Sequence, residues 1–225
     1  MNHPGLSPFP PVVFALGPVQ VTLTVIYTWV EMAALVGVAA VFTRALGPRP
    51  GGGQNLLEMV VEWLLDTIGA VAGPRPERLL TLVGTLALFI AVGDCMSVVP
   101  GLMAPTRDLG TTAALSLVVF CAVPYYGVRD RGLTGYLRHY LEPAWVMLPF
   151  NLLAEVSRTV AMAVRLFGNM MSEELIIAVL LTLAGLLVPV PIMALSLLTG
   201  LVQAYIFSVL TLVYIGAVLG GRGGG

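Results

Sequence analysis

Long apolar stretches alternate with short polar connections along the chain. A helix needs about 20 apolar residues to cross a bilayer, and the apolar stretches cover residues 21–42, 79–99, 111–128, 145–187 and 191–219. The fourth stretch would extend about 65 Å as one helix, so it has to be strongly tilted, partly interfacial or broken. The pattern predicts an all-α polytopic membrane protein with about five transmembrane helices.

Two prolines separate the last two stretches. Val188-Pro189-Val190-Pro191 is interpreted as a turn, because proline removes a backbone donor and disfavours helix at the preceding residue. The last two helices are therefore expected to form a long tilted hairpin.

Residues 54–70 show a different pattern. Glu58, Glu62 and Asp66 recur at every fourth position, while apolar residues occupy the other face. This spacing predicts an amphipathic helix that lies in the membrane interface or against another protein. We interpret the acidic stripe as a solvated polar face rather than a cation path.

These elements predict a single membrane domain covering residues 1–225. Its expected parts, in chain order, are an N-terminal segment (1–20), a first span (21–42), the interfacial helix (54–70), two spans (79–128), the long hairpin (141–220) and a tail (221–225).

Composition supports the membrane assignment and limits the chemistry. The chain of 225 residues is 58% hydrophobic and 10% charged, which is typical of an integral membrane protein. All 11 basic residues are arginine, so the lysine of a nucleotide-binding phosphate loop is missing. His3 and His139 lie outside the apolar stretches, which argues against a haem site. We expect no cofactor and no metal centre.

The distribution of arginines predicts the orientation in the membrane. When the connections are assigned in order, only Arg107 falls on one side, and eight arginines share the other. Those eight are Arg44, Arg49, Arg75, Arg78, Arg129, Arg131, Arg138 and Arg222. Because arginine is enriched in cytoplasmic connections, we expect the N-terminus outside and the C-terminus in the cytoplasm.

Arg165 is the most informative residue, since it lies inside the long fourth apolar stretch. A guanidinium near the bilayer centre costs from about 3 to more than 10 kcal/mol, and no carboxylate lies within one helical turn of it. Arg158, Asn169 and Ser172 share its helical face. Glu174 falls on roughly the opposite face, where we expect a water-filled cavity.

A second polar stripe is expected on the last helix, where Ser196 and Gln203 are seven residues apart. Two polar stripes on adjacent helices are consistent with an ion path. The alternative is that these side chains only bond to one another and hold the hairpin together.

Several motifs resemble those of one family. They are residues 165–170 (Arg-Leu-Phe-Gly-Asn-Met), 174–176 (Glu-Leu-Ile), 202–207 (Val-Gln-Ala-Tyr-Ile-Phe), 210–214 (Leu-Thr-Leu-Val-Tyr), 105–108 (Pro-Thr-Arg-Asp) and 98–101 (Val-Val-Pro-Gly). Together they resemble subunit a, the stator ion channel of F-type ATP synthases. The short chain further resembles the compact variant of sodium-linked bacterial operons.

The resemblance implies that Arg165 faces the rotating ring of c subunits and separates two offset ion half-channels. It also implies that the other partners are b-type peripheral stalk subunits, the catalytic head and the lipid bilayer, with no nucleic acid. The chain is then not an enzyme by itself. Its expected location is the bacterial inner membrane, as a multi-pass protein.

The resemblance also assigns the ion-path residues. Asn169, Glu174 and Gln203 match positions that line the outer half-channel, and Ser172 and Ser196 are further candidates. Glu173 adjoins Glu174, so either carboxylate is a candidate for the outer path. On the cytoplasmic side, Glu155 and Asn151 compete for one role, because Glu155 lies about one helical turn nearer to Arg165 than the family pattern requires.

The resemblance leaves some features open. Glu31 and Asp94 lie in the first two spans and are not explained by the family pattern. The coupling ion, proton or sodium, is not determined. An alternative function is a secondary transporter with a midplane arginine site for an anionic solute, although no internal repeat is visible.

Overall fold

The computed structural model describes residues 12–16, 19–44, 52–72, 77–97, 104–141, 147–184 and 189–219. Its elements are β1 (Val12–Leu16), β2 (Val19–Thr22), α1 (Leu23–Arg44), α2 (Gly52–Ala72), α3 (Glu77–Ser97), η1 (Pro105–Arg107), α4 (Leu109–Leu141), α5 (Met147–Ala184) and α6 (Pro189–Leu219). Among the described helices, five are long and apolar enough to cross a membrane, namely α1, α3, α4, α5 and α6. The predicted class, a polytopic helical membrane protein, is confirmed.

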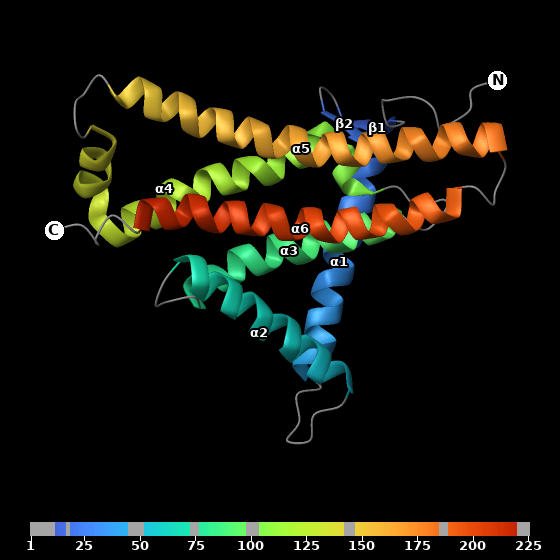
Figure 1. The fold of residues 1–225 in the computed structure, drawn as a ribbon, viewed down its shortest axis with the longest axis horizontal. Helices are drawn as coiled ribbons and strands as arrows, with labels where there is room; N and C mark the ends of the chain where they lie inside the picture. Colours follow the sequence, from blue (N-terminus) through green and yellow to red (C-terminus); the bar gives the residue numbers. More distant parts are fainter. Residues whose placement is uncertain are drawn as a thin grey trace.

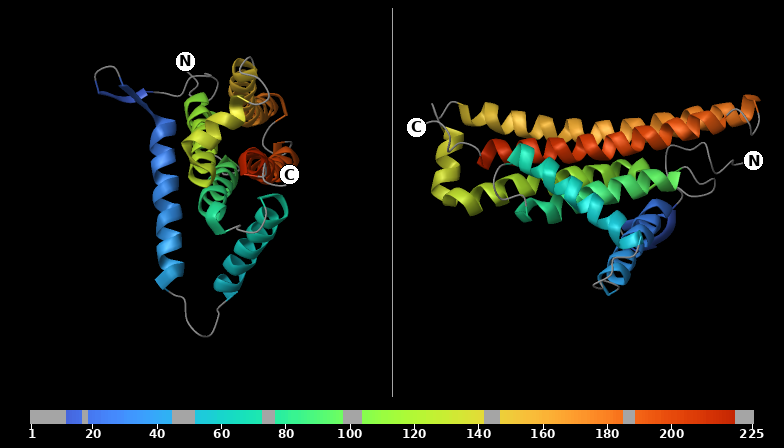
Figure 2. Two further views of the ribbon diagram at one scale, coloured as in Figure 1. Left: turned by 90° about the vertical axis from the view of Figure 1, so that its left-hand side faces the viewer. Right: turned by 60° about the horizontal axis from the view of Figure 1, so that its bottom comes forward.

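Four of these helices run side by side in one bundle, and the first crosses it. In Figures 1 and 2, α3, α4, α5 and α6 lie along the long axis of the molecule, whereas α1 runs steeply across them. α5 is continuous over its 38 residues. Of the three arrangements expected for this long stretch, the broken helix is therefore excluded for the described residues.

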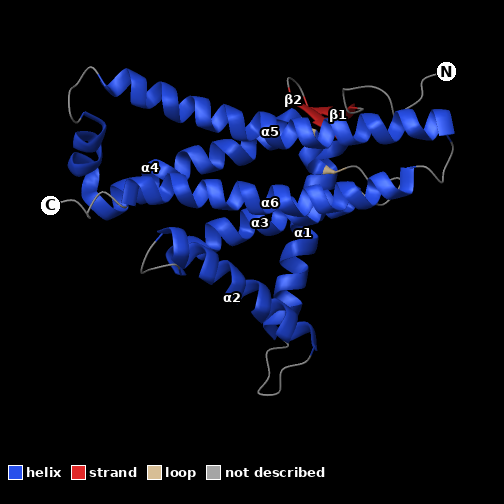
Figure 3. Cartoon of the chain, in the orientation of Figure 1, coloured by secondary structure: helices blue, strands red, loops and turns tan. Residues whose placement is uncertain are grey.

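The boundaries differ from the sequence-based prediction at three places. Pro189–Pro191 begin α6 instead of forming the turn, since proline is tolerated in the first helical turn; Val188 lies outside the described residues. α4 continues past residue 128 to Leu141, with a bend at Gly132, whose φ of 74° suits glycine. In the expected N-terminal segment, β1 pairs antiparallel with β2 (Figure 3).

Two apolar clusters hold the bundle together. One joins α2, α3, α4 and α6, and the other joins α3, α4, α5 and α6. α5 packs mainly on α4, while α6 packs mainly on α3. The second cluster contains Leu86, Ile90, Val119, Met162, Leu166, Ala204 and Phe207. Because it includes Leu166, it fixes the rotation of α5 about its own axis.

The amphipathic character of α2 is confirmed. Its apolar residues Leu64 and Ile68 are buried against the bundle, where α2 contacts α6 and α3. Its acidic residues Glu58, Glu62 and Asp66 are exposed. The acidic stripe is therefore on the surface of the isolated chain, as predicted for a solvated face.

Candidate functional site

Arg165 lies near the middle of α5 and points away from the bundle. Its neighbour Leu166 is fully buried, and successive helical residues are rotated by about 100°, so Arg165 is exposed. Arg158, Asn169 and Ser172 are also exposed, as predicted for residues that share one face. Within the described residues, Arg165 has no ion pair. The long helix thus presents an uncompensated cation on its outer surface.

One polar contact joins the two hairpin helices close to this arginine. Asn169 Nδ2 donates a hydrogen bond of 2.8 Å to Gln203 Oε1, and Gln203 is only 4% exposed. Ser172 Oγ instead donates to the carbonyls of Gly168 and Asn169 in its own helix. The predicted stripes on α5 and α6 therefore meet at Asn169 and Gln203.

The adjacent acids Glu173 and Glu174 contact different elements. Glu173 Oε1 accepts a hydrogen bond from Thr199 Oγ1 of α6. Glu174 Oε1 lies 2.5 Å from Arg107 Nη1, which η1 supplies. Glu174 therefore has a counter-ion from another element, and the expectation that it faces a water-filled cavity stays a prediction. Since Arg107 is 9% exposed, much of this pair is shielded from water.

Ser196 lies near the start of α6 and is 5% exposed. Among the described residues its hydroxyl has no hydrogen-bond partner. Asn169, Ser172, Glu173, Glu174, Ser196 and Gln203 therefore lie on one side of Arg165 along the hairpin. We call this group the outer polar region.

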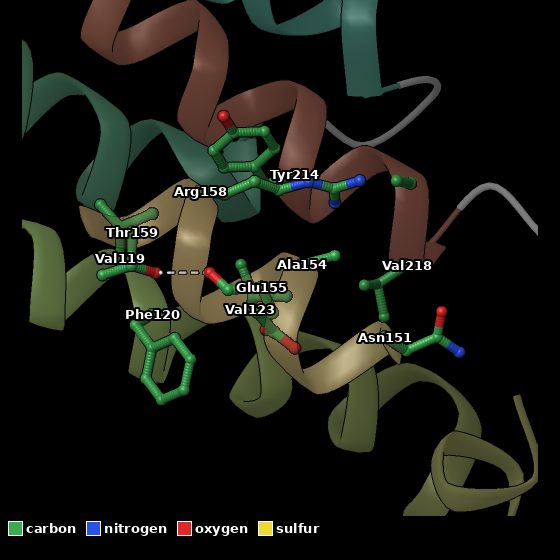
Figure 4. A pocket seen from close by; sticks show the side chains of 11 residues that line it. Val119, Phe120, Val123, Asn151, Ala154, Glu155, Arg158, Thr159, Tyr214 and Val218 are labelled. Atoms are coloured by element: carbon green, nitrogen blue, oxygen red, sulfur yellow. Dashed lines mark hydrogen bonds between the residues drawn. The ribbon is translucent and has the colours of Figure 1, made fainter. Parts of the chain in front are cut away.

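A cavity lies on the other side of Arg165 along α5. It has a volume of about 300 Å³, and Asn151, Glu155 and Arg158 are among its lining residues. Figure 4 shows Arg158 beside the ring of Tyr214, with the guanidinium carbon 5.4 Å from the ring centroid. Both sequence candidates for the cytoplasmic path thus line the same cavity. We call it the inner cavity.

Arg165 separates these two regions. Glu155 and Glu173 are eighteen residues apart, which corresponds to about 27 Å along a helix, and Arg165 lies between them.

The candidate site residues predicted from the sequence did not include Arg107, Thr199 and Tyr214, although Arg107 and Tyr214 lie in the motifs quoted above. Their partners, Glu174, Glu173 and Arg158, lie on another element in every case. Helical spacing shows only which residues share a face of one helix. The available signal for Arg107 was its position as the lone arginine on its side of the membrane.

Comparisons with known proteins agree with the motifs. A sequence model of the family described as ATP synthase A chain matches residues 25–216. The ATP synthase subunit a 2 of Bradyrhizobium sp. (strain BTAi1 / ATCC BAA-1182) is 50% identical over 207 residues, covering 92% of this chain and 93% of the relative. The ATP synthase subunit a of Albidiferax ferrireducens is 47% identical over 219 residues, covering 96% and 95%. This chain therefore belongs to the ATP synthase subunit a family and is a multi-pass membrane component of the ATP synthase complex.

Proposed function

We propose that this chain provides two offset ion half-channels and that Arg165 faces a ring of c subunits. The observation that carries the proposal is the exposed guanidinium of Arg165 on α5, without an ion pair in the described part of the chain and flanked by two separate polar regions. A bare cation on a membrane helix is costly unless another group compensates it. A carboxylate on a partner subunit supplies that compensation.

The proposed mechanism follows from opposite charges. Arg165 favours the ionised form of a ring carboxylate that approaches it, so a loaded ring site releases its cation there. The empty site then passes Arg165 with its charge compensated. Because Arg165 also repels free cations, a cation cannot move directly from one half-channel to the other. Transport therefore requires rotation of the ring.

The outer polar region serves as the half-channel open to the outside, and the inner cavity serves as the cytoplasmic one. This assignment places the N-terminus outside and the C-terminus in the cytoplasm of a bacterial inner membrane. The partners are the c ring, b-type stalk subunits and the catalytic head, where nucleotide chemistry takes place. The chain itself carries no enzymatic activity. Family membership removes the support for a secondary transporter.

Cysteine cross-linking tests whether the face of Arg165 contacts the ring. Ile176 is 49% exposed and lies about 20° from Arg165 around the helix axis. Ile176→Cys, in a background with Cys95→Ser and Cys121→Ser, should form a disulfide with a cysteine placed on the outer helix of the ring. Gel mobility of the oxidised complex provides the measurement.

Val160→Cys is the matched control. Val160 is 54% exposed on the same helix but lies about 140° from Arg165. It should give little cross-linking under the same conditions. Equal cross-linking from both positions, or from Val160→Cys alone, would mean that another face of α5 meets the ring.

The inner cavity gives a prediction that separates Glu155 from Asn151. A carboxylate carries a negative charge that attracts a cation, whereas an amide is neutral. We therefore expect Glu155→Gln to lower ATP-driven pumping by about a hundredfold, the lower end of the range of general acid–base effects, and Asn151→Ala to lower it less. Pumping is measured in vesicles that carry the assembled complex. The reverse order of effects would assign the cytoplasmic role to Asn151.

A further inference from the structure

Two carboxylates lie in the interior on helices that the proposed path does not use. Glu31 of α1 and Asp94 of α3 are each 1% exposed. They lie near enough to each other for their charges to repel. An ionised carboxylate in a dry interior needs a compensating cation or a proton. Ionisation of both carboxyl groups is therefore unfavourable unless a bound cation or proton compensates their charge.

A glycine lies next to each of the two carboxylates. Gly93 faces Glu31, and an added Cβ would lie 3.2 Å and 3.3 Å from the two carboxylate oxygens. Gly200 of α6 faces Asp94, and a Cβ there would lie 2.6 Å from Asp94 Cβ and 3.1 Å from Oδ2. A side chain at either position would crowd the carboxylate. The two glycines thus allow α1, α3 and α6 to enclose one buried polar region.

Several oxygens of this region lack a hydrogen bond of good geometry, and the backbone group close to Glu31 is that of Gly93. Thr106 Oγ1 donates a hydrogen bond of 2.9 Å to Asp94 Oδ1. Asp94 Oδ2, both Glu31 carboxylate oxygens and Ser196 Oγ are buried without a hydrogen-bond partner among the described residues. Ser196 lies one turn before Gly200 and so on the same side of α6. Buried polar atoms are normally paired, so this set has the character of a cation-binding site.

The surrounding charges favour a cation. Glu173 lies close enough to Asp94 for their charges to repel each other. Asp94 thus interacts with two other carboxylates, Glu31 and Glu173, while the cation Arg107 is paired with Glu174. Within the described residues, however, no group of three or more His, Cys, Asp or Glu side chains is arranged to hold a metal ion. When one of the two carboxyl groups is protonated, the pair carries a single negative charge and matches one monovalent cation.

We propose that Glu31, Asp94 and Ser196 form a binding site for one monovalent cation, a proton or a sodium ion, which the two carboxylates share. The inference rests on the function proposed above, because Asp94 borders Glu173 of the outer polar region. The site is a station for the transported cation between the outside and Arg165. Through Glu31, it makes the first span a direct participant in transport.

Chemical labelling tests the site without relying on activity. The purified complex is treated with a hydrophobic carbodiimide, which reacts with protonated buried carboxyl groups, and labelling of Glu31 and Asp94 is measured by mass spectrometry. A sodium site predicts that NaCl suppresses labelling at constant pH while choline chloride does not. A proton site predicts labelling that follows pH and ignores sodium. Absence of labelling, or labelling insensitive to both, would overturn the proposal.

Transport gives the second test. Glu31→Gln should raise the cation concentration for half-maximal ATP-driven pumping by about tenfold, as expected when one charged ligand of a site is lost. Glu58→Gln removes an exposed carboxylate of α2 and should have no effect. If Glu31→Gln does not assemble, Ser196→Ala removes one hydroxyl and should shift the same midpoint in the same direction.

The two proposals can fail separately. Unchanged cation dependence in both Glu31→Gln and Ser196→Ala would overturn the cation site, while cross-linking of Ile176→Cys to the ring would still support the half-channel function. Loss of that cross-link would count against the half-channel function, whatever the labelling of Glu31.

Discussion

Arg165→Ala is expected to abolish both gradient-driven ATP synthesis and ATP-driven pumping in vesicles that carry the assembled complex. A nearby arginine favours the ionised form of a carboxylate by about one to three powers of ten, so without it a loaded ring site retains its cation. Alanine also removes the charge that repels free cations between the outer polar region and the inner cavity. Passive leakage of the coupling ion should therefore rise as coupling is lost.

Arg129→Gln provides the matched control for removal of one exposed guanidinium. Arg129 lies on α4, where it donates a hydrogen bond of 3.1 Å to Tyr125 Oη. We expect this variant to couple normally. Both variants are first checked for a full subunit complement, and each assay is run with and without sodium to identify the coupling ion. Normal coupling in Arg165→Ala would reduce Arg165 to a structural charge.

Arg107→Ala is expected to have the largest effect on stability. Arg107 is mostly buried, and its removal leaves Glu174 without the cation that lies 2.5 Å away. Breaking a buried ion pair on one side costs about 3–5 kcal/mol. The cost should be smaller here, because Glu174 is 38% exposed and solvent screening weakens exposed pairs. The measurement is the thermal midpoint of the detergent-solubilised complex and the amount of this chain it retains.

The double variant Arg107→Gln with Glu174→Gln separates pairing from packing. With both charges removed, neither partner is left as an isolated ion, so the double variant should be more stable than the single variant Arg107→Gln, which has the same side chain at position 107. If it is no more stable, the charge of Arg107 does not stabilise the structure through Glu174. If Arg107→Ala alone is as stable as the unmodified complex, the ion pair does not hold η1 against α5.

The sequence predicted those parts of the site that depend on one helix. Arg158, Arg165, Asn169 and Ser172 share an exposed face because helical spacing determines their directions. It also predicted that a second polar stripe on α6 lies nearby, and the Asn169–Gln203 hydrogen bond joins the two stripes.

Contacts between distant segments were not predictable in the same way. Arg107 reaches Glu174 only because η1 is folded against α5, and no periodicity encodes that contact. Glu31 and Asp94 were visible as unusual intramembrane acids, but their proximity depends on how α1 crosses the bundle. The bend in α4 was not predicted, because the apolar stretch ends at residue 128 and the helix continues beyond it to Leu141 with the bend at Gly132.

The continuity of α5 has a consequence for the stoichiometry of the whole machine. In the mechanism proposed above, a single uninterrupted helix carries Arg165 as the barrier between the outer polar region and the inner cavity. Under the proposed mechanism, each ring site therefore exchanges one cation per passage, and the number of cations per full turn equals the number of ring subunits. Substitutions in this chain can change how much of the ion flow is coupled to rotation, but they cannot change the number of cations per full turn. The number of cations transported per ATP is consequently determined by the ring, whose sites pass this helix one at a time.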